Sequence, residues 1–269
     1  MSHQTQPGNT ASKAKATALS AVAAAALWLS PDQVNASQQE KVMNPTPVAT
    51  ASSQSLSARQ QAIVPVTAWA ASGDMARLDT ALNSALDAGM SMNEAKELLV
   101  QVYAYAGFPR SLNALGELMK VVAARKQRGV VDAQGQEPGP VPKGDALLAQ
   151  GTANQTQLSG GPVTGPLFDF APAIDEYLKT HLFGDIFARS NLDWQSRELA
   201  TLGILAALPG VESQLQSHMR ISMNTGLTAG QLQQVAQILA SQVDAASGAR
   251  AESALNAHLR SLQASAKAE

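Results

Sequence analysis

Apolar residues recur at helical spacing along the chain, and no run of alternating strand residues stands out. In the first half, successive apolar positions are separated by three or four residues. They are Ala95, Leu98, Leu99, Val102 and Ala106. This spacing places them on one stripe of a helix. The pattern therefore predicts an all-α fold.

A second helix is predicted upstream of this one. The apolar positions of its face are Ile63, Val66 and Ala70. Ser57, with Gln60 three residues later, fits a capping box at its start. Pro65 lies inside the segment and lacks the amide hydrogen that a helix interior uses. We therefore expect Pro65 to kink or shorten this helix.

One helix junction occurs twice with the same local chemistry. It reads GMSMNE at 89–94 and GLTAGQ at 226–231. In each copy a glycine can adopt the left-handed conformation that ends one helix, and Ser or Thr can cap the next, with Glu or Gln three residues on. Further aligned pairs are Gly73 and Gly210, Leu78 and Leu215, and, after one inserted residue, Arg59 and Arg197. The chain is therefore predicted to contain two related helical modules in tandem.

The amino terminus has the layout of a signal peptide over residues 1–36. Lys13 and Lys15 precede an apolar run, and a small-residue cleavage pattern ends at Ala36. The run is shorter than the roughly 20 residues that span a bilayer, so we expect no stable membrane anchor. Cleavage after Ala36 would give a periplasmic or secreted protein. The alternative interpretation is an Ala-rich buried helix.

Composition divides the remainder into a flexible leader, two modules and a linker. The leader covers 37–54, the first module 55–126, the Gly/Pro-rich linker 127–166 and the second module 167–265. Pro138, Gly139 and Pro140 are expected to prevent regular structure in the linker.

Overall composition excludes several classes of function. Hydrophobic residues make up 45% of the 269 residues, which is enough to bury a substantial core. The 19 basic and 21 acidic residues leave a net charge of −2, which disfavours a nucleic-acid partner. Cysteine is absent, so disulfides, thiolate metal sites and thiol redox chemistry are excluded.

Several separated motifs resemble those of the carboxymuconolactone decarboxylase family. The first half contains a tyrosine–glycine–proline segment, YAYAGFPRSLNA at 103–114. The second half continues in the family's order with HLFGDIF at 181–187, NLD at 191–193, REL at 197–199, SH at 217–218 and NTGLT at 224–228. The resemblance covers Ser55 to Lys126 and Phe168 to Leu262.

The resemblance implies an all-helical fold whose units associate into homo-oligomers, with one of two chemistries. One branch of the family decarboxylates a carboxylated muconolactone without a cofactor. The alkylhydroperoxidase-D-like branch uses a Cys-x-x-Cys pair with a nearby His and an upstream Glu. The positions corresponding to those cysteines carry Val211 and Gln214, so thiol peroxidase activity is unsupported.

The two halves keep different parts of the family pattern. The counterpart of the tyrosine–glycine–proline segment reads QVDAASGAR at 242–250, without the tyrosine or proline. The second half instead keeps Glu198 and His218, whose aligned positions in the first module are Gln60 and Ala81. We therefore expect one site per chain.

Glu198 and His218 flank a turn at Pro209 and Gly210 that should fold two helices back on each other. Their side chains could then face one another as an acid–base pair, with the carboxylate orienting the imidazole. Decarboxylation needs a proton delivered to carbon, which His218 could supply. The alternative is a partly buried structural histidine with one hydrogen bond.

Three further residues are candidates for substrate binding. His181 could bind a carboxylate or fill a module interface. Arg110 could anchor a carboxylate through its planar fork, or be a cation at a helix start. Tyr105 is a pocket candidate, although Tyr103 and Tyr105 could both be core residues with polar tips.

No metal or cofactor is expected. The histidines, at positions 3, 181, 218 and 258, lack metal-ligand spacing, and the glycines form no phosphate loop.

Two functions are compatible with these observations. The first is a decarboxylase-like lyase for a small carboxylated lactone or related acid. The second is a non-catalytic protein that binds a ligand or forms an oligomeric scaffold. A buried, mutually bonded Glu198 and His218 beside a polar cavity would favour the enzyme.

Overall fold

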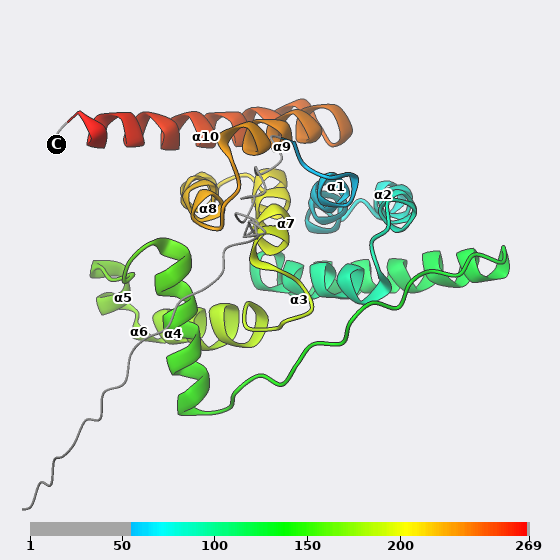
Figure 1. Ribbon diagram of the computed structural model, residues 1–269, viewed down its shortest axis with the longest axis horizontal. Coiled ribbons are helices and arrows are strands. Elements are labelled where there is room, and N and C mark those ends of the chain that lie inside the picture. Colours follow the sequence, from blue (N-terminus) through cyan, green and yellow to red (C-terminus); the bar gives the residue numbers. More distant parts are fainter. Residues whose placement is uncertain (1–54, 268–269) are drawn as a thin grey trace, which may run out of the picture. The chain divides into compact units, whose positions relative to one another are not determined.

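The computed structural model describes residues 55–267, and its regular elements in this range are helices (Figure 1), as the hydrophobic pattern predicts. The bounds are α1 (Ala58–Ser72), α2 (Met75–Asp87), α3 (Met92–Gln127), α4 (Asp145–Ser159), α5 (Pro166–Phe170), α6 (Pro172–Tyr177), the π-helical η1 (Leu178–Ile186), α7 (Trp194–Ala207), α8 (Glu212–Asn224), α9 (Ala229–Gln242) and α10 (Ala245–Ala266). The predicted signal peptide and leader lie outside the described residues. Within 55–267, none of the helices combines the length and hydrophobicity that crossing a membrane requires.

The predicted helix starts are confirmed. Ser57, Ser91 and Thr228 each cap a helix, and each forms a capping box with the Gln or Glu three residues on. Gly89 and Gly226 adopt left-handed φ angles of 89° and 96°, which end α2 and α8. Local side-chain chemistry therefore fixes the equivalent junctions in both repeats.

The expected shortening of α1 at Pro65 is wrong. The helix continues through Pro65 to Ser72, and residues 63–71 are all buried. A proline inside a helix removes one hydrogen bond, but burial of Pro65 and of the residues that follow it outweighs that loss. Tertiary packing, which is not local in sequence, decides the length of this helix.

Helix α3 consists of two arms separated by a break at Gly107. Gly107 has φ 80° and ψ 165°, which are not helical values. The Ser111 hydroxyl donates a hydrogen bond of 2.8 Å to the carbonyl of Leu99. Twelve residues of straight helix would separate these two residues by about 18 Å. The second arm therefore folds back along the first, as α10 follows α9 in the second repeat.

The predicted linker over 127–166 is only partly correct, because it contains α4. Residues 130–143 lack helix, but Asp145–Ser159 forms a helix that packs closely on η1. A Cβ atom at Gly151 would lie 1.7 Å from the Lys179 carbonyl oxygen, and the Asn154 amide donates to the Phe183 carbonyl at 2.8 Å. The small and polar residues that indicated a linker therefore include residues, such as Gly151, that allow α4 to pack closely on η1.

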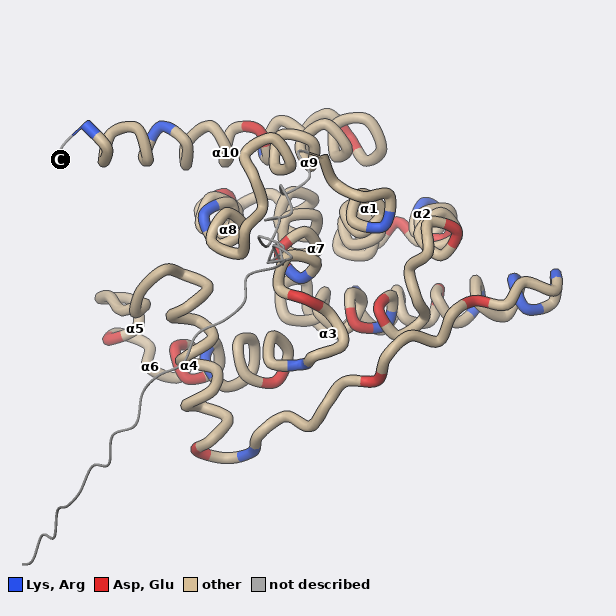
Figure 2. The backbone as a smooth tube through the Cα atoms, viewed as in Figure 1, with Lys and Arg blue, Asp and Glu red and all other residues tan. Residues whose placement is uncertain are grey.

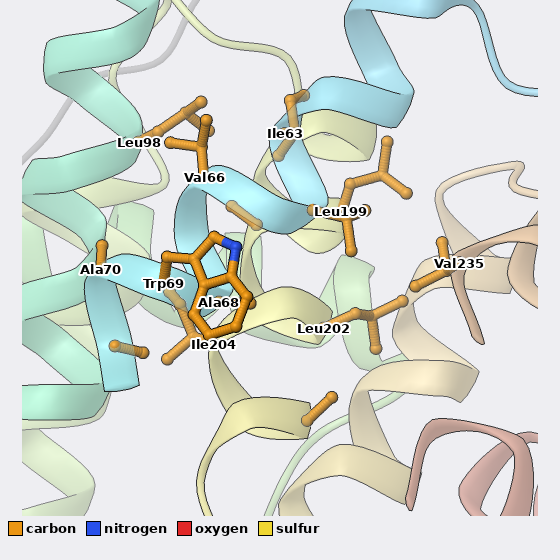
Figure 3. Close-up of a cluster of buried hydrophobic side chains, with 14 of the residues drawn as sticks. Ile63, Val66, Ala68, Trp69, Ala70, Leu98, Leu199, Leu202, Ile204 and Val235 are labelled. Atoms are coloured by element: carbon orange, nitrogen blue, oxygen red, sulfur yellow. The ribbon is translucent and has the colours of Figure 1, made fainter. Parts of the chain in front are cut away.

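The larger of the hydrophobic clusters in the described residues contains residues of both repeats. Helices α1 and α7 pair most extensively, and α3 and α9 pack beside them. Figure 3 shows part of this core, including Trp69 of α1, Leu98 of α3, Leu202 of α7 and Val235 of α9. The two repeats therefore pack on each other within one chain.

Gly203 permits the close approach of α1 and α7. A Cβ atom at this position would lie 2.3 Å from the Thr67 hydroxyl oxygen and 2.7 Å from the Val64 carbonyl oxygen. Real Cβ contacts essentially never fall below 3.0 Å, so a side chain here would force the two helices apart.

We expect Gly203→Ala to lower the free energy of unfolding by about 1–3 kcal/mol, since overpacking at the helix contact exceeds the gain in helix propensity. Gly116→Ala is the matched control, because nothing lies within 4 Å of a Cβ there. It should be neutral or stabilise by up to about 1 kcal/mol. Urea denaturation followed by circular dichroism measures both. Equal effects of the two substitutions would contradict the close contact at Gly203.

Candidate active site

Glu198 and His218 form a buried pair. Asp193 caps α7 by accepting a hydrogen bond of 2.8 Å from the Ser196 amide, which places Glu198 in the first turns of that helix. The chain then reverses at Gly210, and α8 carries His218 back. Glu198 Oε2 lies 2.8 Å from His218 Nδ1, and Glu198 is fully buried. The predicted juxtaposition is therefore present.

The two ring nitrogens of His218 have different surroundings. In a pair of this geometry an ionised Glu198 accepts a hydrogen bond from Nδ1, which would hold the imidazole in one tautomer. Nε2 makes no hydrogen bond to residues 55–267, and it is not among the enclosed polar atoms that lack a partner. Nε2 is thus the nitrogen that can exchange a proton with a bound molecule or solvent.

Tyr105 from the first repeat lies against His218. The ring centroids are 5.7 Å apart at an interplanar angle of 81°, and the Tyr105 and Thr201 hydroxyl oxygens are 3.4 Å apart. Burial, together with the nearby Glu198 carboxylate, raises the pKa of Tyr105 well above its usual value. The hydroxyl is therefore neutral at physiological pH and can donate a hydrogen bond. Tyr105 of the first repeat therefore contacts the Glu198–His218 pair of the second repeat through the His218 ring.

A line of polar side chains on α3 extends from Tyr105 into the contact between α3 and α7. Glu97, Gln101 and Tyr105 are four residues apart on the first arm of α3, so they share one helical face. Gln101 donates to the Arg197 carbonyl at 2.8 Å and to the Thr201 hydroxyl at 2.9 Å. Sequence reasoning missed this polar seam. The sequence feature that could have indicated it is the spacing of four residues between Glu97, Gln101 and Tyr105, next to the apolar stripe of the same helix.

At the far end of the polar seam, Glu97 joins α3 to α7. Arg197 donates to Glu97 at 2.9 Å, and Arg189 donates to both carboxylate oxygens at 2.8 and 3.0 Å. Asn191 adds a contact of 3.2 Å. Burial opposes ionisation of Glu97, but the hydrogen bonds and charges of Arg189 and Arg197 outweigh it and hold its pKa below the usual value.

Two predicted binding residues lie elsewhere. His181 bonds Asp185 at 3.0 Å and stacks edge-on against Tyr103, with the ring centroids 5.2 Å apart. Arg110 is exposed and packs against Gly73 at the end of α1. Within residues 55–267, no hydrogen bond, ion pair or ring contact joins either residue to Glu198 or His218. The structure therefore brings together Glu198, His218 and Tyr105, whereas the contacts of His181 and Arg110 are with other residues.

The main surface pockets of the described residues do not reach the His218 pair. One of them, with a volume of about 540 Å³, lies between α1 and α2. Residues 55–267 contain no group of three or more His, Asp or Glu placed to hold a metal ion. Acidic and basic residues are interspersed along the described helices (Figure 2).

A family profile matches this chain. The profile described as "Carboxymuconolactone decarboxylase family" matches residues 46–119 and 172–261, which together are more than half of the chain. The two matched segments correspond to the two predicted modules. A search of curated proteins found no match.

Replacing Glu97 with Gln should lower the free energy of unfolding at pH 7 by about 3–5 kcal/mol, because two arginines lose their buried counter-charge. Glu117→Gln on the second arm of α3 is the control. Its partner Lys120 is exposed, so a change below about 1 kcal/mol is expected. Chemical denaturation of the three proteins measures this difference.

The same substitution should alter the pH dependence of stability. The folded pKa of Glu97 is depressed, so its contribution is complete above the usual value of 4.5 and is lost as the pH falls through the lower folded value. Wild type should therefore lose more stability than Glu97→Gln on acidification. Parallel pH profiles would show that Glu97 is not ionised in the fold.

Proposed function

Because the chain belongs to the carboxymuconolactone decarboxylase family, we propose that it is a cofactor-free lyase that removes carbon dioxide from a small carboxylated lactone or related acid. The buried hydrogen bond between Glu198 and His218 is the observation that supports this proposal. In the proposed reaction His218 is the general acid–base and Glu198 is its positioning residue. The part of the chain that the structure describes holds one such pair.

The proposed step transfers one proton and breaks one carbon–carbon bond. The bond to the substrate carboxylate breaks, carbon dioxide leaves, and the electron pair moves through the adjacent double bond. Protonated His218 delivers its Nε2 proton to the carbon that receives the pair. The imidazole then regains a proton from solvent. Glu198 stabilises the imidazolium through Nδ1 throughout the cycle.

Tyr105 is proposed to orient the substrate. Its raised pKa keeps the hydroxyl protonated, so the hydroxyl can donate to a lactone carbonyl or to the charge that develops there. The ring lies edge-on to His218, with the ring centroids 5.7 Å apart, so Tyr105 and His218 are neighbours. Substrate would then contact both repeats.

The thiol chemistry of the alkylhydroperoxidase-D-like branch has no nucleophile in this chain. That mechanism requires a thiolate, and the sequence contains no cysteine. A thiol peroxidase is therefore not proposed.

A non-catalytic binding protein is the second candidate, and one observation favours it. The main pockets of the described residues are lined by side chains other than Glu198 and His218. An acid–base enzyme needs access to His218 Nε2. The two candidates therefore differ in whether His218 meets a reacting molecule.

The test is ultraviolet-monitored turnover of carboxymuconolactone and related lactone acids by the full chain. His218→Ala should lower kcat by about 10²–10⁴-fold, the usual contribution of a general acid–base. Tyr105→Phe should lower kcat while preserving the shape of the pH–rate profile. Gln216→Ala, which is exposed and lies two residues before His218 on the opposite side of α8, is the control and should retain the wild-type rate. Circular dichroism checks that each variant is folded.

Two results would count against the lyase. Equal turnover by wild type and His218→Ala would remove the role of His218. No turnover by wild type of any lactone acid would favour the binding protein.

A further inference from the structure

The repeat predicts a second location equivalent to the His218 site. Gly89 and Gly226, which end equivalent helices, are 137 residues apart. Applying the same shift to His218 gives Ala81, and applying it to Tyr105 gives Gln242. The counterparts of the histidine and the tyrosine are therefore an alanine and a glutamine.

The shift of 137 residues, without an insertion, makes Gln61 the counterpart of Glu198. The sequence alignment, with one inserted residue, assigned this position to Gln60. Gln60 instead completes the capping box, because the Ser57 amide donates to its side-chain oxygen at 3.0 Å.

Gln61, Ala81 and Gln242 come together around a pocket of about 540 Å³. Its walls come from α1 and α2 of the first repeat and the end of α9 of the second. The His218 site has the same construction in reverse, with α7 and α8 of the second repeat and Tyr105 of the first. Where His218 and Tyr105 fill the space in one copy, Ala81 and Gln242 line a pocket in the other.

The chemistry of this pocket indicates binding rather than catalysis. Glutamine, alanine and glutamine replace glutamate, histidine and tyrosine, so no acid–base pair is present. The remaining lining side chains are Ala58, Ala62, Pro65, Trp69, Arg77, Thr80, Ser84 and Ala88. Arg77 is the one charged member of this lining, and no carboxylate contributes to it. A pocket with a cation and no anion favours an anionic ligand.

Arg77 has a defined position at the pocket. Its guanidinium carbon lies 4.7 Å from the centre of the Trp69 ring, a cation–π contact. Asp74, the cap of α2, is 3.5 Å away, but both side chains are exposed and water screens the pair. The planar guanidinium can therefore still bind a carboxylate through two hydrogen bonds.

We propose that this pocket binds a small carboxylic acid with a flat ring. The carboxylate would pair with Arg77, and the ring would contact Trp69 and the alanine-rich wall. The volume falls within the roughly 300–1,000 Å³ of typical small-molecule pockets. The proposal does not rest on the lyase activity, because none of its residues belongs to the Glu198–His218 pair.

The test is isothermal titration calorimetry of the full chain with benzoate, using benzamide as the neutral probe of the same shape. Wild type should give a saturating heat with benzoate. Arg77→Gln should weaken benzoate at least about tenfold, the usual effect of losing a charged hydrogen-bond partner, and should change benzamide less. Ala81→Leu, which fills the pocket, should remove benzoate binding.

Two control variants separate this pocket from the His218 site. Gln214 is the repeat counterpart of Arg77, so Gln214→Ala should leave benzoate binding at wild-type strength. His218→Ala should also retain it, even if turnover is lost. Benzoate binding that resists both Arg77→Gln and Ala81→Leu, or the absence of binding at millimolar benzoate, would overturn the proposal. Because Arg77 is exposed, its replacement tests the pocket even if Ala81→Leu fails to fold.

Discussion

The close contact of α1 with α7 is the constraint on which the rest of the fold depends. Gly203 removes the side chain that would separate the two helices, so Val64 and Thr67 meet the backbone of α7 directly. These two helices are equivalent, because α1, α2 and α3 of the first repeat correspond to α7, α8 and α9 of the second. Because they occupy the centre together, the third helix of each repeat packs on the first helix of the other, α3 on α7 and α9 on α1. A complete site must therefore use residues from both repeats.

The buried network around Glu97 makes the contact of α3 with α7 chemically different from the equivalent contact of α9 with α1. Two buried charges cost free energy unless they pair with good geometry, and Arg197 and Arg189 provide that geometry. The counterparts of Glu97 and Arg197 are Gln234 and Gln60, which are neutral. Of these two contacts, the one between α3 and α7 therefore contains the buried charges. Hydrogen bonds from Gln101 to Thr201 and between Thr201 and Tyr105 continue along the same contact. The opposite contact, of α9 with α1, has Val64 and Ile238 in place of Thr201 and Gln101.

Local rules predicted much of this structure from the sequence. The helix class, the caps at Ser57, Ser91 and Thr228, and the pairing of Glu198 with His218 follow from spacing, capping chemistry and the family motifs. The polar seam does not, because Glu97 and Arg197 are 100 residues apart in the chain. Helix α4 was not predicted because its composition is typical of linkers. It packs on η1, a contact that is not visible in the local sequence. Arg110 and His181 lie in family motifs, but motif position alone does not show which side of a helix a residue occupies.

The difference between the two copies of the site also has a physical explanation. An enclosed carboxylate without its imidazole partner would be an uncompensated buried charge, and an enclosed imidazole without a carboxylate would lose its fixed tautomer. Intermediate combinations therefore cost stability, and a copy that lacks the histidine is more stable when it also lacks the glutamate. Gln61 and Ala81 satisfy that condition together. Removing the large imidazole leaves space, so the same substitutions that end acid–base chemistry in one copy create the pocket beside Arg77 and Trp69.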